Sequence, residues 1–242
     1  MPPLALTHCR SWLFVPGHDP EHLDAALASA ADAIVVDLEE FTPPEARHGA
    51  CLAFPAFAER ARQHGQHPMA RINALAAGGD DELARLIAGA PTAIFLPRVE
   101  EDTQLLALAQ ALDAAETYQG LAQGVTALIP TLETRRGVEG AEGLLRTTPR
   151  LTAALLGTGD LAGDLGLTSS ERAAGLRPFR ERFLAACRDA GIAAIDGPWP
   201  EQDGFDEDQA WAIARGFRAR CITAPAQIPF LHDALSTRPR AD

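Results

Sequence analysis

Residues 128–134 read LIPTLET, an apolar stretch that ends in an acid where a buried strand would place another apolar residue. A strand of this kind either leaves the core for water or delivers a ligand to a site at its end. The same order, an apolar run followed by acids, recurs at AIVVDLEE (33–40) and again before GTGD (157–160). This recurrence favours delivery to a site.

Short apolar runs alternate with longer amphipathic segments, such as residues 102–118 and 177–190, along the whole chain. This alternation predicts strand, crossover helix and parallel strand, repeated about eight times. With 242 residues, 47% of them hydrophobic, and no Ser/Gly linker, the chain fits one domain over residues 1–242. We expect an α/β fold, a closed (β/α)8 TIM barrel. The expected strands are residues 12–15, 33–38, 69–72, 93–96, 126–129, 153–156, 193–195 and 221–223.

In such a barrel the carboxyl ends of the strands meet at one mouth, where the following loops form the active site. The second, fifth and sixth expected strands end in acids, in DLEE, LET and GTGD, and the third ends in RIN with Arg71. Converging carboxylates with one arginine would repel each other unless a cation lay among them. The pattern therefore predicts a divalent metal at the mouth.

Seven motifs follow one another along nearly the whole chain: RSWLFVPG (10–17), AIVVDLEE (33–40), ARIN (70–73), LPRVE (96–100), IPTLET (129–134), GTGDLAGDLG (157–166) and AIDGPW (194–199). By these motifs the sequence resembles the citrate lyase β-subunit-like group of the HpcH/HpaI aldolase and citrate lyase family. The resemblance implies a TIM barrel and a carbon–carbon lyase. It also implies that Glu133 and Asp160 bind Mg²⁺, with Mn²⁺ as the alternative ion, and that Arg71 and Glu133 hold the substrate.

The residue types at the mouth suit this chemistry. The fork of donors on Arg71 would grip an oxo acid and stabilise a developing alkoxide, although Arg71 could also be a structural partner of Asp37. Asp37, Glu39 and Glu40 are acid or base candidates, or partners of the groups that touch substrate. Glu40 stands where the family pattern has aspartate in its citrate lyase type and histidine in its hydroxy-dioate aldolase type, which argues against the latter.

One segment departs from the family pattern. Residues 219–228 read ARCITAPAQI where the family usually reads GK-x-x-IHP-x-Q-I, so Arg220 and Ala224 replace a lysine and a histidine. Recognition of a coenzyme A moiety is therefore an open question. The cations that could meet its phosphates are Arg10, Arg98 and Arg220; Arg10 either binds the substrate in this way or braces the first strand.

Three functions remain open. The first is a magnesium-dependent lyase acting on a 3-hydroxy-carboxyacyl-CoA such as citryl-, malyl- or citramalyl-CoA, with a metal-chelated oxo acid as product or co-substrate. The second is a metal-dependent aldolase on free oxo acids, favoured by the altered segment. The third is a barrel that binds without turnover, opposed by the intact Glu133, Asp160 and Arg71.

Composition excludes several other classes. All 21 basic residues are arginine, so Schiff-base catalysis, pyridoxal phosphate anchoring and a Walker-type loop, which need lysine, are excluded. The net charge of −12 with scattered bases argues against nucleic acid, and no stretch is apolar enough to span a membrane. Four separated cysteines and an amino terminus unlike a signal peptide predict a cytoplasmic protein.

By the resemblance we expect a homotrimer or larger homo-oligomer, with residues 222–235 as the contact.

Overall fold

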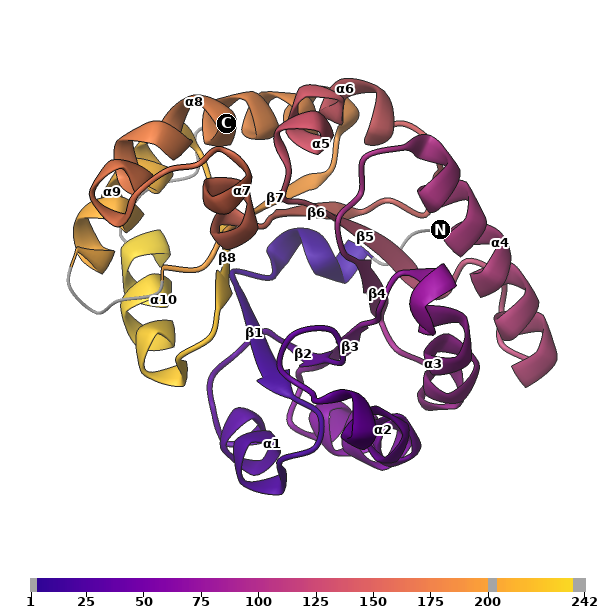
Figure 1. The fold of residues 1–242 in the computed structure, drawn as a ribbon. Helices are drawn as coiled ribbons and strands as arrows, with labels where there is room; N and C mark the ends of the chain where they lie inside the picture. The colour runs from indigo at the N-terminus through magenta and orange to yellow at the C-terminus, as the bar shows by residue number, and fades with distance from the viewer. Residues whose placement is uncertain (1–3, 200–203, 237–242) are drawn as a thin grey trace.

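The structure, a computed structural model, describes residues 4–199 and 204–236. Eight parallel strands close into a barrel in sequence order, which confirms the predicted TIM barrel, and helices surround it (Figure 1). The strands are β1 (Ser11–Pro16), β2 (Ala33–Asp37), β3 (His67–Arg71), β4 (Ala93–Leu96), β5 (Ala127–Leu132), β6 (Ala153–Leu156), β7 (Ala193–Asp196) and β8 (Ala219–Ile222).

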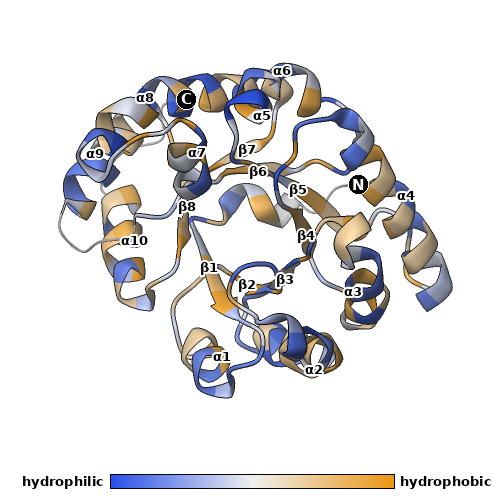
Figure 2. Ribbon diagram, viewed as in Figure 1, coloured by the Kyte–Doolittle hydropathy of each residue, from blue (hydrophilic) through white to orange (hydrophobic). Residues whose placement is uncertain are grey.

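At least one helix follows every strand, and the helices of the outer ring carry hydrophobic and hydrophilic residues together (Figure 2). A 3-10 helix, η1 (Leu4–His8), precedes β1, and three others lie between later elements: η2 (Leu75–Ala77), η3 (Ile87–Gly89) and η4 (Pro225–Gln227). The α-helices are α1 (Pro20–Leu27), α2 (Pro44–Gln63), α3 (Gly79–Leu86), α4 (Asp102–Gln119), α5 (Arg135–Glu139), α6 (Ala141–Leu144), α7 (Thr158–Asp164), α8 (Ser169–Ala190), α9 (Phe205–Arg215) and α10 (Ile228–Ser236).

The apolar residues form two layers because side chains of a strand alternate between its faces. In β1, Leu13 and Val15 belong to the layer between strands and helices, whereas Trp12 and Phe14 belong to the layer inside the barrel. The inner layer is tightly packed: the rings of Trp12 and Phe14 meet Phe95 edge to face, with centroids 5.9 and 5.2 Å apart. The barrel is therefore a filled core, and a site can form only above this layer.

Only β4 and β6 have the expected bounds; the other six strands differ by one to three residues at an end, and two of these differences bear on the site. β5 continues past Pro130 to Leu132, because Thr131 and Leu132 pair with Leu155 and Leu156 of β6. β8 begins at Ala219 and includes Arg220, a residue that an apolar pattern would leave out of a buried strand. Tertiary partners decided both boundaries.

One helix also begins earlier than its apolar pattern suggested. α8 starts at Ser169, eight residues before the expected start at Arg177, and Pro178 lies inside it. Thr168 and Glu171 form a capping box that fixes this earlier start.

A buried cluster of charges joins the last elements of the barrel. Arg180 of α8 and Arg220 of β8 both bind Asp196 of β7 and Asp208 of α9. Arg180 also lies over the ring of Trp211, 4.4 Å from its centroid. Each charge has opposite partners, so burial leaves none of them uncompensated.

Among the described residues, no helix is long and apolar enough to cross a membrane.

Candidate active site

Glu133 continues the inward-facing register of β5. Ala127 and Ile129 belong to the inner apolar layer, and Thr131 and Glu133 follow at two-residue intervals on the same face. Glu133 is 3% exposed and lines a cavity of about 100 Å³ at the mouth of the barrel. The acid of LIPTLET is thus delivered into the barrel and not to water.

Arg71 occupies the same inward register at the end of β3, two residues after Met69 of the inner layer. Its Nε and Nη2 atoms donate to the two oxygens of Asp37, at 2.7 and 2.6 Å, in a bidentate pair. Nη2 also donates to Glu40 at 2.9 Å, and Nη1 lies 3.1 Å from a carboxylate oxygen of Glu39. All three acid candidates of the DLEE segment therefore surround one guanidinium.

The charge of Arg71 is secured by these neighbours. Burial alone would lower the pKa of Arg71, but the hydrogen bond and the charge of Asp37 outweigh it and raise the pKa above its ordinary value. Glu39 behaves in the opposite way: burial raises its pKa, the charge of Arg71 opposes the shift, and Glu40 and Asp37 add to it. The surroundings of Glu39 therefore favour its protonated form.

The loop after β2 is fixed by its own first residue. The Asp37 carboxylate accepts the backbone N–H groups of Glu39 and Phe41, at 3.0 and 3.2 Å. Thr42 donates its hydroxyl to the Asp37 carbonyl, and Arg47 donates to the carbonyls of Glu39 and Thr42. Asp37 is fully buried and fully engaged, so it orients the loop and Arg71.

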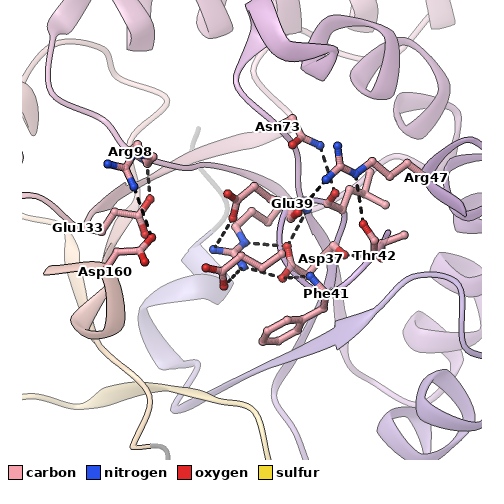
Figure 3. A network of polar contacts seen from close by, with 12 residues as sticks. Asp37, Glu39, Phe41, Thr42, Arg47, Asn73, Arg98, Glu133 and Asp160 are labelled. Carbon is pink, nitrogen blue, oxygen red and sulfur yellow. Dashed lines mark hydrogen bonds and ion pairs between the residues drawn. The ribbon is translucent and has the colours of Figure 1, made fainter. Parts of the chain in front are cut away.

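Glu133 and Asp160 lie together with Arg98 on one side of the site, apart from Asp37, Glu39 and Phe41 (Figure 3). The backbone N–H of Arg98 donates to Glu133 at 2.6 Å, and Nη1 of Arg98 lies 3.8 Å from Asp160. Arg98 has a φ of 50°, in the left-handed region that residues other than glycine rarely adopt. Its role as an N–H donor to Glu133 could not be read from the sequence.

The surroundings of Glu133 favour its protonated form when no cation is present. Burial raises the pKa of Glu133 to about 7, Arg71 and the Arg98 N–H oppose the shift, and Asp160 and Glu39 add to it. A cation between Glu133 and Asp160 would favour the ionised form and displace the proton.

Gly157 gives Glu133 its space. A Cβ atom at Gly157 would lie 2.5 Å from both Cβ and Oε2 of Glu133, closer than any side chain allows. Gly157 directly precedes α7, whose third residue is Asp160. The glycine of GTGD therefore lets the β6 end approach β5 and places the two acids side by side.

The cavity has an apolar floor and a polar rim. Phe14, Leu155 and Cys221 line it from the inner layer, and Arg71 lies over the ring of Phe14, 5.4 Å from its centroid. The hydroxyl of Thr131 is buried in this lining and has no hydrogen-bond partner within the described part of the chain. Sequence reasoning missed Thr131, although its spacing of two from Glu133 signals the same face.

The donor set fits a hard divalent cation. Mg²⁺ is commonly held by one or two carboxylates, with water and substrate oxygens completing its shell. Glu133 and Asp160 supply two carboxylates, and Asp160 is 42% exposed at its side chain, so ligands can enter from solvent. Groups of three or more His, Cys, Asp or Glu side chains suited to a metal do not occur in residues 4–199 and 204–236.

The sequence model of the HpcH/HpaI aldolase/citrate lyase family matches residues 10–223. The chain belongs to this family. The expected resemblance is confirmed, and so is the expected class of enzyme, a lyase. The extent of the domain over residues 1–242 stays a prediction.

Two curated relatives and one solved structure illustrate the family. Citrate lyase subunit beta of Escherichia coli (strain K12) is 28% identical over 236 residues, 93% of this chain and 76% of the relative. The (3S)-malyl-CoA thioesterase of Cereibacter sphaeroides (strain KD131) is 26% identical over 239 residues, 95% of this chain and 78% of the relative. CitE from Mycobacterium tuberculosis, solved with magnesium, acetoacetate and coenzyme A, is 28% identical, with a TM-score of 0.76 over 98% of this chain and 83% of that one.

Arg10 and Arg220, two of the cations expected to meet the substrate or its phosphates, do not lie at the site. Arg10 precedes β1, at the amino end of the barrel, where its backbone and guanidinium bind Asp32 at 2.7 to 3.2 Å. The prediction that Arg10 binds substrate is therefore wrong, because a residue before a parallel strand lies at the end opposite the mouth. Arg220 is 2% exposed and committed to Asp208 and Gln209, so it cannot meet a coenzyme phosphate.

Proposed function

We propose that the chain is a magnesium-dependent carbon–carbon lyase that acts on a 3-hydroxy-carboxyacyl-CoA and releases or consumes an oxo acid. One observation carries this proposal: a buried arginine and two metal-type carboxylates, Arg71 with Glu133 and Asp160, line one small cavity at the mouth of the barrel. The relatives support it by name, since one is a citrate lyase subunit and another acts on malyl-CoA.

Glu133 and Asp160 would hold the metal, with manganese as the alternative ion. Bound there, Mg²⁺ supplies a Lewis acid that polarises the oxygen of the oxo acid. The donor chemistry of the two carboxylates and the space left by Gly157 support this assignment.

Arg71 would hold an oxygen of the substrate and stabilise the negative charge that develops on it. Its guanidinium is preorganised by the bidentate contact with Asp37, so little reorganisation is needed at the moment of reaction. A buried cation that cannot lose its proton suits this role.

Cleavage of the bond between C2 and C3 of the substrate requires that a proton leave the 3-hydroxyl and that a proton reach the enolate carbon of the thioester. Glu39 is our candidate for this proton transfer, because its pKa is raised by burial and it lies 3.1 Å from Arg71. Asp37 would orient Arg71 and the loop. The chain has no lysine, and burial raises the pKa of the Cys221 thiol in the cavity lining to about 12, so carboxylates are the available acids and bases.

An assay of purified protein with MgCl₂ and citryl-, malyl- or citramalyl-CoA tests the proposal, with acetyl-CoA release as the readout. We expect turnover that EDTA abolishes and that Asp160→Asn lowers by at least about a hundredfold, as loss of a metal ligand does. Equal activity of the Asp160→Asn variant would contradict the metal assignment.

A second function, an aldolase acting on a free oxo acid without coenzyme A, is favoured by one specific observation. Arg220, which replaces the lysine of the family pattern, is buried in ion pairs with Asp196 and Asp208 and has no exposed donor for a coenzyme phosphate. Calorimetry of oxaloacetate and MgCl₂, with and without acetyl-CoA, separates the two functions. Enhancement by acetyl-CoA supports the thioester substrate, whereas inert acetyl-CoA together with oxo-acid turnover supports the free acid.

A further inference from the structure

Arg71 has few donors left for a ligand. A guanidinium carries five N–H groups. Asp37 takes Nε–H and one N–H of Nη2, Glu40 takes the other N–H of Nη2, and Glu39 faces Nη1. A substrate carboxylate that is to be gripped by two parallel N–H groups must therefore use the edge formed by Nη1 and Nη2, and half of this edge is held by Glu40.

The three carboxylates around Arg71 differ in how firmly they are held. Asp37 is buried, binds Arg71 twice and accepts two backbone N–H groups. The side chain of Glu39 is 24% exposed, and that of Glu40 is 46% exposed. Arg71 is the one hydrogen-bonding partner of the Glu40 carboxylate among the described residues. Glu40 is thus the carboxylate whose movement away from Arg71 breaks the fewest hydrogen bonds.

The backbone that carries Glu40 is fixed while its side chain is free to turn outward. The N–H groups on both sides of it, from Glu39 and Phe41, are bound to Asp37. The carbonyl of Glu39 is bound by Arg47, and Thr42 is bound to the Asp37 carbonyl. Displacement of Glu40 therefore requires side-chain rotation alone.

We propose that Glu40 occupies the substrate's place on Arg71 and that the carboxylate of an incoming oxo acid displaces it. The inference rests on the proposed function for the identity of the ligand. Glu40 is then a specificity-determining residue: only an anionic group that binds Arg71 better than Glu40 does gains the Nη1–Nη2 edge, and neutral ligands leave it closed.

Two variants and one matched control test the inference. Glu40→Ala removes the competing carboxylate, and Glu40→Gln keeps its length with a weaker acceptor. Glu100→Gln removes a carboxylate from the loop after β4, at the same mouth, where its partner is Arg136 and not Arg71. Calorimetry measures oxaloacetate binding in MgCl₂. Modification of Arg71 by phenylglyoxal, mapped by mass spectrometry, measures access to the guanidinium without metal or substrate.

We expect Glu40→Ala to bind oxaloacetate at least about tenfold more tightly, the lower end of the range for one hydrogen bond to a charged group, with a smaller gain for Glu40→Gln and none for Glu100→Gln. Arg71 should react faster with phenylglyoxal in Glu40→Ala only. Binding in Glu40→Ala that is absent, or no tighter than in Glu100→Gln, overturns the inference, and so does an unchanged rate of Arg71 modification.

Failure of the proposed function is recognised separately. It would appear as oxaloacetate binding that ignores EDTA and the Asp160→Asn substitution, together with no thioester turnover in wild type. The phenylglyoxal rate reports on Glu40 in either case.

Discussion

At the scale of single residues, folding raises the pKa of Glu133 far enough to make the stability of the protein depend on pH. Burial raises its pKa from 4.5 to about 7, so the folded state without metal binds a proton more tightly than the unfolded chain. Protonated Glu133 thus contributes stability that is present in full below about pH 4.5 and is lost as the pH rises through about 7.

Glu133→Gln, an uncharged mimic of the protonated acid, should therefore gain stability over wild type as the pH rises. In EDTA we expect a small difference at pH 5 and roughly 2 to 3 kcal/mol in favour of the variant at pH 8, because one pKa unit corresponds to about 1.4 kcal/mol. Urea unfolding at both pH values measures it. Added magnesium should stabilise wild type at pH 8 and leave the variant unchanged. A stability difference that is the same at both pH values would contradict a raised pKa.

At the scale of elements, the junction between β6 and α7 decides whether the two metal-type carboxylates meet. Gly157 lets α7 begin against Glu133, while Gly197 after β7 packs against Thr158 in the same way: a Cβ atom there would lie 2.3 Å from the Thr158 hydroxyl. Thr158 in turn donates to the carbonyl of Pro198 at 3.2 Å. Two close backbone approaches therefore fix the helix that carries Asp160.

Gly157→Ala should misplace Glu133, since its Cβ would need space that the Glu133 side chain fills. We expect magnesium-dependent binding of pyruvate to weaken by at least about tenfold, because small misplacements of a site cost this much or more, and a moderate loss of stability from overpacking, about 1 to 3 kcal/mol. Calorimetry and thermal melts measure both.

Gly163→Ala is the control for this substitution. Gly163 lies in the same helix, and a Cβ atom there would meet nothing within 4 Å. It should bind pyruvate as wild type does and gain up to about 1 kcal/mol from the higher helix propensity of alanine. Equal binding by both alanine variants would show that Gly157 is not needed for the placement of Glu133.

At the scale of the whole molecule, the cluster of Arg180, Asp196, Asp208 and Arg220 holds the last quarter of the barrel together. It connects β7, β8, α8 and α9, and Arg220 also donates to the carbonyl of Gly197 at 3.1 Å. β8 in turn pairs with β1 to close the barrel.

Arg220→Met should destabilise the protein by about 3 to 5 kcal/mol, since Asp196 and Asp208 would then share the single positive charge of Arg180 and one buried negative charge would be uncompensated. Arg60→Ala is the control: Arg60 pairs with Asp24 at 2.7 Å, but both side chains are more than half exposed, so the expected loss is below about 1 kcal/mol. Denaturant unfolding of both variants measures the contrast. Similar losses for the two variants would mean that the cluster does not stabilise barrel closure.

The assembly of the protein is also a property of the whole molecule, and a homotrimer or larger homo-oligomer stays a prediction. Within the expected contact segment, residues 222–235, the side chains of Ile222, Ile228 and Leu231 are buried in the chain's own core and are not available to a neighbouring subunit. Phe230 of α10 is 53% exposed and is the large apolar side chain of this run that could meet a neighbour. We expect Phe230→Ser to lower the mass measured by light scattering; a single-chain mass for wild type at micromolar concentration would exclude the oligomer.

The sequence by itself determined the order of strands and helices, the closed barrel and the gathering of Arg71, Glu133 and Asp160 at or just after the carboxyl ends of strands. These features are local: the apolar alternation sets which residues face inward, and parallel strands bring their carboxyl ends to one mouth whatever the details of packing. The family motifs added the lyase class and the prediction of a metal, and the comparisons confirm the family and the lyase class.

Only the tertiary structure decided which charge meets which. Arg10, Arg71 and Arg220 look alike in sequence, yet one braces the amino end with Asp32, one gathers three carboxylates at the mouth, and one is buried with Asp208. The tertiary structure also decided that β5 extends to Leu132 by pairing with β6, and that the backbone N–H of Arg98 donates to Glu133. Most of these partners lie more than twenty residues apart in the sequence or on neighbouring strands; Asp208, twelve residues before Arg220, is the exception. The pairs form only when the barrel closes. The physical reason is that a charge can be buried only where folding brings it an opposite charge or a hydrogen bond.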